Sequence, residues 1–137
     1  MTVSIVVASG KGGVGKTSVS VNLGLCFARQ GRRTILFDAD FGMANAHILI
    51  GANPKRFIMD VLDGSSSMTD ILCDAPHGMK FISGGSGLLD MLNVEKTTRY
   101  QTIRMVDELR DEFEVLIVDA PAGASDNSIA FVGAADH

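Results

Sequence analysis

The sequence is poor in several residue types that mark particular classes of protein. Its 137 residues include no tryptophan, one tyrosine and only two cysteines, Cys26 and Cys73, which form no CxxC pair. Two distant cysteines favour reduced thiols in a cytoplasmic protein over a disulfide or a metal site. No apolar run reaches about 18 residues, the length of a membrane span. The first residues also lack the basic flank and long apolar stretch of a signal peptide.

An excess of positive charge is also absent. The chain has 12 Lys and Arg residues against 16 Asp and Glu residues, which gives a formal net charge of −4. A negative total argues against broad electrostatic binding to nucleic acid, although a local basic patch would not show in it. Hydrophobic residues make up 46% of the chain. That share is typical of a folded protein, and the length suits one domain.

Apolar segments alternate with helical patterns along the chain. Strands are predicted at 3–8, 34–37, 80–83 and 115–118, and helices at 16–30, 44–50, 57–62, 97–111 and 125–133. This order is typical of an α/β three-layer sandwich with a mostly parallel sheet. Ligands of such sheets bind at the carboxyl ends of the strands. Segments 10–17, 38–47 and 119–126 follow three of these ends, so the functional residues are expected there.

The first of these segments is a glycine-rich loop between a strand and a helix. It reads Gly10-Lys11-Gly12-Gly13-Val14-Gly15-Lys16-Thr17. Glycines let a loop curl around an anion so that its backbone N–H groups point inward, and the helix N-terminus adds its dipole. In this pattern Lys16 would reach the β- and γ-phosphates, and the Thr17 hydroxyl would bind Mg²⁺. The alternative is a glycine-rich turn that only matches the motif; the flanking strand and helix favour the phosphate loop.

Lysine and aspartate residues around this loop are open to two interpretations each. Lys11 is not required by the basic motif; it either points into solvent or lies near a phosphate that separates it from Lys16. Asp38 and Asp40 end a strand at a spacing of two, which suits a metal-bound water and an attacking water but also an ordinary acidic turn. Asp119 follows a buried strand, as a Mg²⁺-binding acid does, or it caps a turn.

The complete loop resembles the deviant Walker A motif of the MinD/ParA family of ATPases. Ser9-Gly10 is more similar to the MinD and FlhG branch than to the plasmid-partition branch. The segment 38–47 resembles switch I of that branch, although His47 stands where an acidic residue is usual. Asp119-Ala120-Pro121-Ala122-Gly123 resembles switch II. Weaker matches at 58–64 and 81–87 favour the FlhG side.

The resemblance implies a P-loop fold, the cofactors ATP and Mg²⁺, and a role for each matching residue. It implies that Lys11 reaches the nucleotide of a partner subunit in an ATP-dependent dimer, that Lys16 binds phosphate and that Asp40 positions the attacking water. The implied metal residues are Thr17, Asp38 and Asp119. The implied nucleotide-binding residues are Gly10, Lys11, Gly12, Gly13, Val14, Gly15, Lys16, Thr17, Ser18 and Asn45.

The resemblance implies that residues 1–137 correspond to the N-terminal part of a single domain of that family. The later strands, the base-contacting segment and a C-terminal amphipathic helix that binds membrane are expected outside this sequence. The resemblance implies a slow ATPase switch that positions cellular machinery, most directly flagella, together with a protein partner that stimulates hydrolysis. A division-site MinD protein, a partition ATPase that docks on DNA or a transcription factor, and a metabolic synthetase or iron-protein reductase of the same superfamily remain the alternatives.

Overall fold

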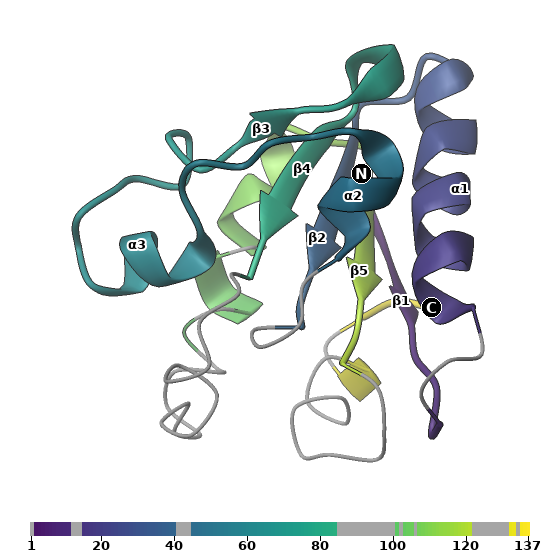
Figure 1. Ribbon diagram of the computed structural model, residues 1–137, viewed down its shortest axis with the longest axis horizontal. Coiled ribbons are helices and arrows are strands. Elements are labelled where there is room, and N and C mark those ends of the chain that lie inside the picture. Colours follow the sequence, from purple (N-terminus) through teal and green to yellow (C-terminus); the bar gives the residue numbers. More distant parts are fainter. Residues whose placement is uncertain are drawn as a thin grey trace.

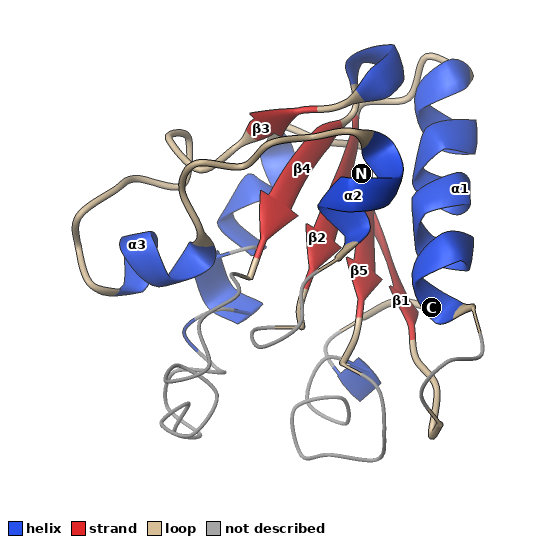
Figure 2. Cartoon of the chain, viewed as in Figure 1, coloured by secondary structure: helices blue, strands red, loops and turns tan. Residues whose placement is uncertain are grey.

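The computed structural model describes residues 2–11, 15–40, 45–84, 101, 103–105, 107–121, 132–133 and 135–137. The strands are β1 (Val3–Val7), β2 (Thr34–Asp38), β3 (Cys73–Asp74), β4 (Lys80–Ser83) and β5 (Val115–Asp119). The helices are α1 (Lys16–Arg29), α2 (Ala46–Ile50) and α3 (Ile58–Leu62), with 3-10 turns η1 (Pro76–Gly78) and η2 (Glu108–Asp111). Figure 1 and Figure 2 show their arrangement.

The strands form one sheet in the order β1-β5-β2-β4-β3. All neighbouring pairs are parallel except β3 and β4, which are antiparallel. The last strand in sequence, β5, therefore lies between the first two, and β1 and β2 pair only through it. Such a switch in strand order opens a crevice at the carboxyl ends of the strands, where ligands of open α/β sheets bind.

Alternate residues of the central strands face two separate cores. In β2, Ile35 and Phe37 face one core and Leu36 faces the other; Leu116 and Ile117 of β5 divide in the same way. Side chains of successive strand residues point to opposite faces of a sheet, so both faces of β2 and β5 are covered. The helices α1 and α2 contribute to one core, and α3 with η2 contributes to the other. The three-layer sandwich predicted from the sequence is confirmed.

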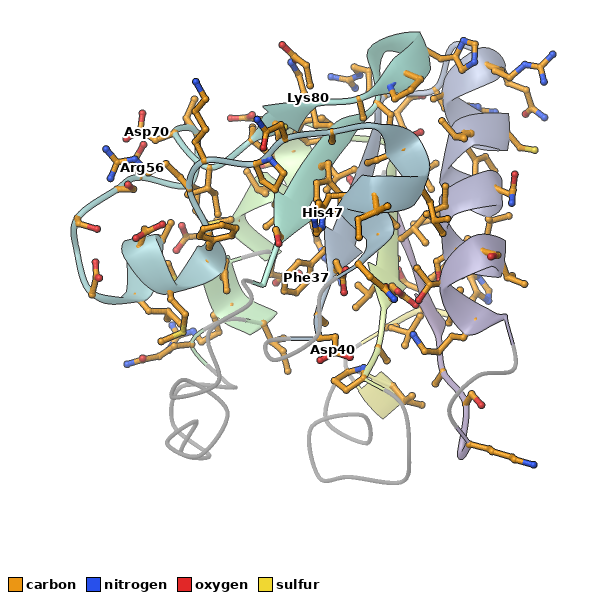
Figure 3. All side chains as sticks on the ribbon, viewed as in Figure 1. Phe37, Asp40, His47, Arg56, Asp70 and Lys80 are labelled. Atoms are coloured by element: carbon orange, nitrogen blue, oxygen red, sulfur yellow. The ribbon has the colours of Figure 1, made fainter. Side chains whose placement is uncertain are left out.

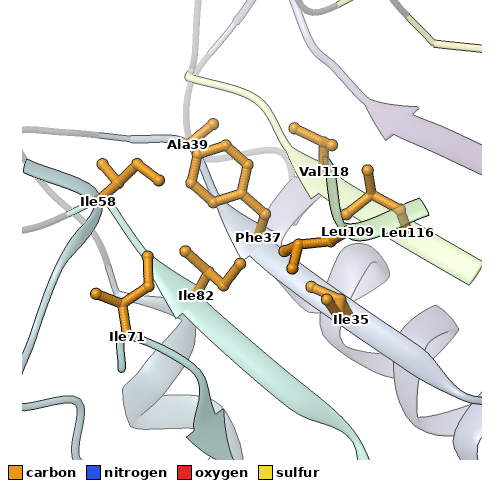
Figure 4. Packing of buried hydrophobic residues seen from close by; sticks show 9 residues of the cluster. All are labelled: Ile35, Phe37, Ala39, Ile58, Ile71, Ile82, Leu109, Leu116 and Val118. Atoms are coloured by element: carbon orange, nitrogen blue, oxygen red, sulfur yellow. The ribbon is translucent and has the colours of Figure 1, made fainter. Parts of the chain in front are cut away.

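The core on the α3 side is built around Phe37, which is fully buried (Figure 4). Its neighbours come from β4, β5, α3 and the segment before β3, for example Ile82, Val118, Ile58 and Ile71. Segments far apart in sequence thus meet on this face, and the contact fixes β2 between β5 and β4.

Helix α1 lies very close to the sheet at Gly24. A Cβ atom at this position would come within 2.9 Å of the Met79 sulfur, and within 3.9 Å of Cγ1 of Ile117. Met79 is fully buried, so it has little room to yield. The missing side chain of Gly24 therefore sets how closely α1 packs on the sheet.

The end of the described chain lies along the outer edge of β1. The Val6 N–H donates to the His137 carbonyl at 2.8 Å, and the His137 N–H donates to the Ser4 carbonyl at 3.1 Å. The Asp136 carboxylate accepts from the backbone N–H and the hydroxyl of Ser4, each at 2.9 Å. The two backbone bonds have the pattern of a parallel strand pair, so this edge of the sheet is covered over these residues.

Most predicted elements are present with ends shifted by one or two residues. The helix predicted over 97–111 is helical at 101, 103–105 and 107 and ends in η2, while 97–100, 102 and 106 lie outside the described residues. For the helix predicted over 125–133, only 132 and 133 are described, and both are helical. The short edge strand β3 was not predicted. Cys26 and Cys73 are free thiols, and no helix among the described residues is long and apolar enough to span a membrane.

Candidate functional site

Three functional segments meet at the carboxyl ends of β1, β5 and β2. Asp119 is the register partner of Val7 on one side and of Asp38 on the other. Backbone hydrogen bonds continue just beyond the strands, from Ala120 N–H to the Val7 carbonyl at 3.1 Å and from Ala39 N–H to the Asp119 carbonyl at 3.0 Å. Asp119 therefore lies between the glycine loop and the acidic segment. The sequence predicted that the three segments share the carboxyl end of the sheet, but it did not predict their order.

The glycine loop joins β1 to α1, as a phosphate loop does. Of its residues, Gly10, Lys11, Gly15, Lys16 and Thr17 are described, whereas Gly12, Gly13 and Val14 lie outside the described residues. Gly15 has φ 86° and ψ 15°, a left-handed conformation that favours glycine, and it is the residue that precedes α1. Its carbonyl accepts the first helical hydrogen bond, from the Val19 N–H at 3.1 Å.

Lys11 and Lys16 have different surroundings although both belong to the loop. Lys11 is exposed, and its backbone is held by Ser9, whose hydroxyl donates to the Lys11 carbonyl at 2.6 Å and accepts from the Lys11 N–H at 3.1 Å. The Lys16 side chain is only 11% exposed, and its ammonium forms an ion pair with the Asp119 carboxylate. One lysine thus faces solvent, and the other is part of a buried polar cluster.

Asp119 is the centre of that cluster. Its side chain is 1% exposed. Besides the Lys16 ammonium, it receives hydrogen bonds from the Thr17 hydroxyl at 2.8 Å and from the Ser20 hydroxyl at 3.0 Å. All three partners lie in the first turns of α1. The contacts bring together the predicted phosphate-binding lysine and the two predicted metal residues on this side of the site.

Ser20 is a member of this cluster that the sequence did not reveal. It is fully buried and lies three residues after Thr17, so both hydroxyls share one face of α1. A hydroxyl among the apolar positions of the buried face was the available signal. Ser18, which was predicted to bind nucleotide, lies on the exposed side of the same helix and accepts a hydrogen bond from Asn22 at its carbonyl.

Asp38 is held by backbone groups of the segment that follows it. It accepts hydrogen bonds from the N–H groups of Asp40 at 3.2 Å, Asn45 at 3.0 Å and Ala46 at 3.1 Å. Burial raises the pKa of the Asp38 carboxyl to about 6. The N–H groups of Ala46 and Asp40 oppose this rise, and the negative charges of Asp119 and Asp40 add to it. Asp38 was predicted as a metal residue; in the structure its oxygens hold the start of α2.

The remaining predicted residues lie around this acidic segment. Asp40 is half-buried just beyond the carboxyl end of β2 (Figure 3). Asn45 is exposed, and its carbonyl accepts the Ile48 N–H at 3.1 Å as α2 begins. His47 is half-buried on α2, and its Nδ1 atom is buried with no hydrogen-bond partner among the described residues. Residues 41–44, in the middle of the segment that resembles switch I, and residues 122–123, the end of the segment that resembles switch II, lie outside the described residues.

The residues present fit a phosphate and a divalent cation. A lysine and an aspartate that neutralise each other in a buried cluster can instead contact an anion and a cation, so charge remains balanced when both bind. A hydroxyl and a carboxylate supply oxygen ligands of the kind that Mg²⁺ prefers. A parallel sheet, a glycine loop that opens a helix and an acid at the end of the neighbouring strand define a P-loop nucleotide-binding protein.

The family can be stated more narrowly. Residues 5–127 match the CobQ/CobB/MinD/ParA nucleotide binding domain, and the chain belongs to this family. The antiactivator FleN of Pseudomonas aeruginosa is 42% identical over 133 residues, which cover 97% of this chain and 48% of FleN. The flagellum site-determining protein YlxH of Helicobacter pylori is 33% identical over 139 residues, 96% of this chain and 45% of YlxH. The chain thus spans about half the length of the curated relatives it matches.

Solved structures of the family have the same fold. The cell division ATPase MinD of Pyrococcus furiosus matches with a TM-score of 0.86 and 25% identity, over 99% of this chain and 57% of that chain. Cobyrinic acid a,c-diamide synthase from Mycobacterium smegmatis, solved with bound ADP and magnesium, matches with a TM-score of 0.81 and 27% identity, over 98% of this chain and 57% of that chain. The predicted resemblance to the MinD/ParA family is confirmed.

Proposed function

We propose that residues 1–137 are the N-terminal part of a single ATPase domain that binds Mg²⁺ and ATP, hydrolyses ATP slowly and dimerises when ATP is bound. The observation that carries this proposal is the meeting of Lys16, Thr17 and Asp119 at the carboxyl ends of β1 and β5. The ADP and magnesium in the M. smegmatis synthase, a protein with the same fold, support both ligands.

Each residue of the cluster has a role in this proposal. Lys16 would exchange its contact with Asp119 for the β- and γ-phosphates, and Thr17 and Asp119 would hold Mg²⁺. When bound, Mg²⁺ would supply positive charge next to the phosphate oxygens. The backbone N–H groups of Gly10, Gly12, Gly13, Val14, Gly15 and Ser18 would bind the phosphates.

The segment from Asp38 to Ala46 contains the residue that we propose positions the attacking water. Asp40 lies beyond the end of β2, and β2 is next to the strand that carries Asp119. We propose that Asp40 orients the attacking water. Asp38 holds the backbone of Asp40, Asn45 and Ala46, so it keeps the segment against the sheet. Any contact of Asp38 with the metal would be through water, and Asn45 would contact the nucleotide from the start of α2.

Lys11 acts outside its own subunit in this proposal. Its side chain is exposed, and two hydrogen bonds with the Ser9 hydroxyl, one donated and one accepted by Ser9, hold its backbone. The loop therefore presents the ammonium to solvent rather than to the Lys16 cluster. A second subunit that brings its nucleotide to this surface would supply the phosphate that Lys11 binds.

The relatives indicate the process that the switch controls. FleN is an antiactivator and YlxH determines the flagellum site, so we propose that the full-length protein regulates flagellar number or placement through a protein partner that stimulates hydrolysis. It would act in the cytoplasm, with peripheral attachment to the inner face of the membrane. A role in choosing the division site is the second candidate, supported by the likeness to MinD of P. furiosus.

Hydrolysis and dimerisation by the full-length protein test the proposal together. Lys11→Ala is expected to abolish the ATP-dependent dimer in light scattering and to leave ADP binding within about twofold. Asp40→Ala is expected to keep the dimer and to lower the hydrolysis rate by about a hundredfold or more. Unchanged hydrolysis in both variants would disprove the mechanism. Salt-sensitive binding of the ATP form to non-specific DNA would favour a partition protein instead.

A further inference from the structure

Ser20 is a buried hydroxyl that the roles assigned above leave unexplained. It is 0% exposed, its Oγ atom lies 3.0 Å from Oδ1 of Asp119, and it lies 3.1 Å from the Lys16 carbonyl. Burying a hydroxyl costs free energy unless the group is hydrogen-bonded, so these contacts account for its presence on the buried face of α1.

The hydroxyl has one proton and two acceptors within reach. The Lys16 carbonyl already accepts the backbone N–H four residues on, as in any α-helix. The Asp119 carboxylate is charged and forms the stronger hydrogen bond. Ser20 therefore donates to Asp119.

The three partners of Asp119 differ in what the proposed function requires of them. Lys16 and Thr17 must both turn from Asp119 toward phosphate and Mg²⁺. Ser20 lies one helical turn after Lys16 in α1 and is fully buried, so its hydroxyl cannot reach a phosphate or a metal ion bound at the loop. Among the described residues, it is the side chain that can keep its hydrogen bond to Asp119 while the other two exchange theirs.

Asp119 also needs such a restraint because of its neighbour. Asp38 is its register partner on β2, so the two carboxyl groups lie on neighbouring strands, where their negative charges repel each other. When the Lys16 ammonium leaves, this repulsion is no longer offset by that cation. A fixed donor on the α1 side would keep the Asp119 carboxylate turned toward α1 and away from Asp38.

We propose that Ser20 is a positioning residue that holds Asp119 in place for Mg²⁺ binding after Lys16 and Thr17 have released it. This inference rests on the proposed function, because it assumes that Asp119 serves the metal. Its consequence is specific: loss of the Ser20 hydroxyl weakens the contribution of Mg²⁺ to nucleotide binding and leaves the contribution of the phosphate loop intact.

The test is calorimetric titration of ADP into the full-length protein, once with Mg²⁺ and once with EDTA. In EDTA, Ser20→Ala is expected to bind ADP with an affinity within about twofold of the wild type. The factor by which Mg²⁺ increases the ADP affinity is expected to be roughly tenfold smaller in Ser20→Ala than in the wild type, as for other residues that orient metal ligands. Ser20→Thr keeps a hydroxyl at the same position and is expected to retain most of that gain.

Thr34→Val is the matched control. Thr34 is also 0% exposed and donates a hydrogen bond, to the Arg32 carbonyl at 3.0 Å, but it lies at the amino end of β2, far from Asp119 in the strand register. It is expected to leave the Mg²⁺-dependent gain unchanged. If Ser20→Ala does not fold, Ser20→Cys replaces the hydroxyl with a weak donor and is expected to show the same loss.

Three results would overturn the inference: a full Mg²⁺-dependent gain in Ser20→Ala, an equal loss of affinity with and without Mg²⁺, or the same loss in Thr34→Val. Each of these leaves the proposed function standing, since the wild type still gains affinity from Mg²⁺. A wild type whose ADP affinity is indifferent to Mg²⁺ would overturn both.

Discussion

Asp38 and Asp119 are neighbours in the sheet, yet the protein holds these two carboxylates in different ways. Asp119 is held by side chains of α1, those of Lys16, Thr17 and Ser20. Asp38 is held by backbone N–H groups between Asp40 and Ala46. Side chains can rotate to a ligand while the helix that carries them stays in place. Backbone groups can leave Asp38 only if the segment itself moves.

The two carboxylates are therefore suited to different tasks. On the α1 side, the partners of Asp119 can be exchanged for phosphate and metal without changing the fold. On the α2 side, Asp38 couples the end of β2 to the segment that resembles a switch.

Replacing Lys16 by alanine is expected to have the largest effect on binding. Lys16→Ala removes two charge-assisted hydrogen bonds to phosphate, each worth roughly 2 kcal/mol, so nucleotide affinity should fall about a thousandfold. Lys80→Ala is the control, because Lys80 pairs with the exposed Asp74 at the far edge of the sheet. Titration of a non-hydrolysable ATP analogue, which has both phosphates, in the presence of Mg²⁺ measures the affinity of both variants. Wild-type affinity in Lys16→Ala would contradict the assignment.

The stability of the protein is expected to depend on pH through Asp38. The folded pKa of Asp38 is about 6 and its reference value is 3.8, so the folded state binds a proton more readily than the unfolded state. Stability from this group is therefore greatest below pH of about 4 and declines as pH rises to about 6, by at most about 3 kcal/mol. Asp38→Asn should remove this part of the slope.

Urea unfolding of both proteins between pH 4 and 7 gives the comparison. The difference between the two curves is the relevant quantity, since Asp63, Asp70, Glu114 and Asp136 have lowered pKa values, chiefly from hydrogen bonds, and act in the opposite sense. Parallel curves would show that Asp38 does not titrate in this range.

Removing the Asp119 side chain is expected to destabilise the nucleotide-free protein. Asp119→Ala leaves the Lys16 ammonium, 11% exposed, and the buried Ser20 hydroxyl without their carboxylate, at a cost of about 2 kcal/mol. Asp74→Ala, which removes an exposed partner of Lys80, should cost less than about 1 kcal/mol. Thermal unfolding without nucleotide measures both. Equal losses would show that burial of the Asp119 cluster contributes nothing extra.

The smallest expected effect is a change in the pKa of Asp38 when a neighbouring charge is removed. Asp119→Asn and Asp40→Asn should both lower this pKa, and Asp119→Asn should lower it more, because Asp119 contributes more to the rise. Carbon-detected NMR titration of the Asp38 carboxyl gives the values. A reversed order would mean that Asp40, and not Asp119, is the main charge facing Asp38.

Local patterns in the sequence were sufficient to predict most helices and strands and to identify the phosphate loop. The apolar runs at β1, β2, β4 and β5 predict their strands, because short apolar segments bounded by polar or glycine residues are recognisable locally. Gly15 and Lys16 were identified because their chemistry is encoded within eight consecutive residues. The placement of Asp119 at a strand end followed from the apolar run before it.

Contacts between segments that are far apart in the sequence could not be predicted from local patterns. The position of β5 between β1 and β2 depends on packing across both faces of the sheet, and β3, only two residues long, pairs with β4 through a register that no local pattern encodes. The contact of Ser20 with Asp119 spans 99 positions. Asp38 was expected to face a metal, and its binding to backbone groups could not be inferred from an acidic spacing alone.

Gly24 gives the site a dependence on a residue that has no side chain and no contact with ligand. The spacing between α1 and the sheet is set where the Cβ atom would meet Met79. A methyl group added there would displace either the Met79 side chain or helix α1. Because Lys16, Thr17 and Ser20 are carried by the same helix, a displacement of α1 would shift all three donors relative to Asp119 at once. A substitution at Gly24 can thus change the geometry of the Asp119 cluster although it replaces none of the residues that form it.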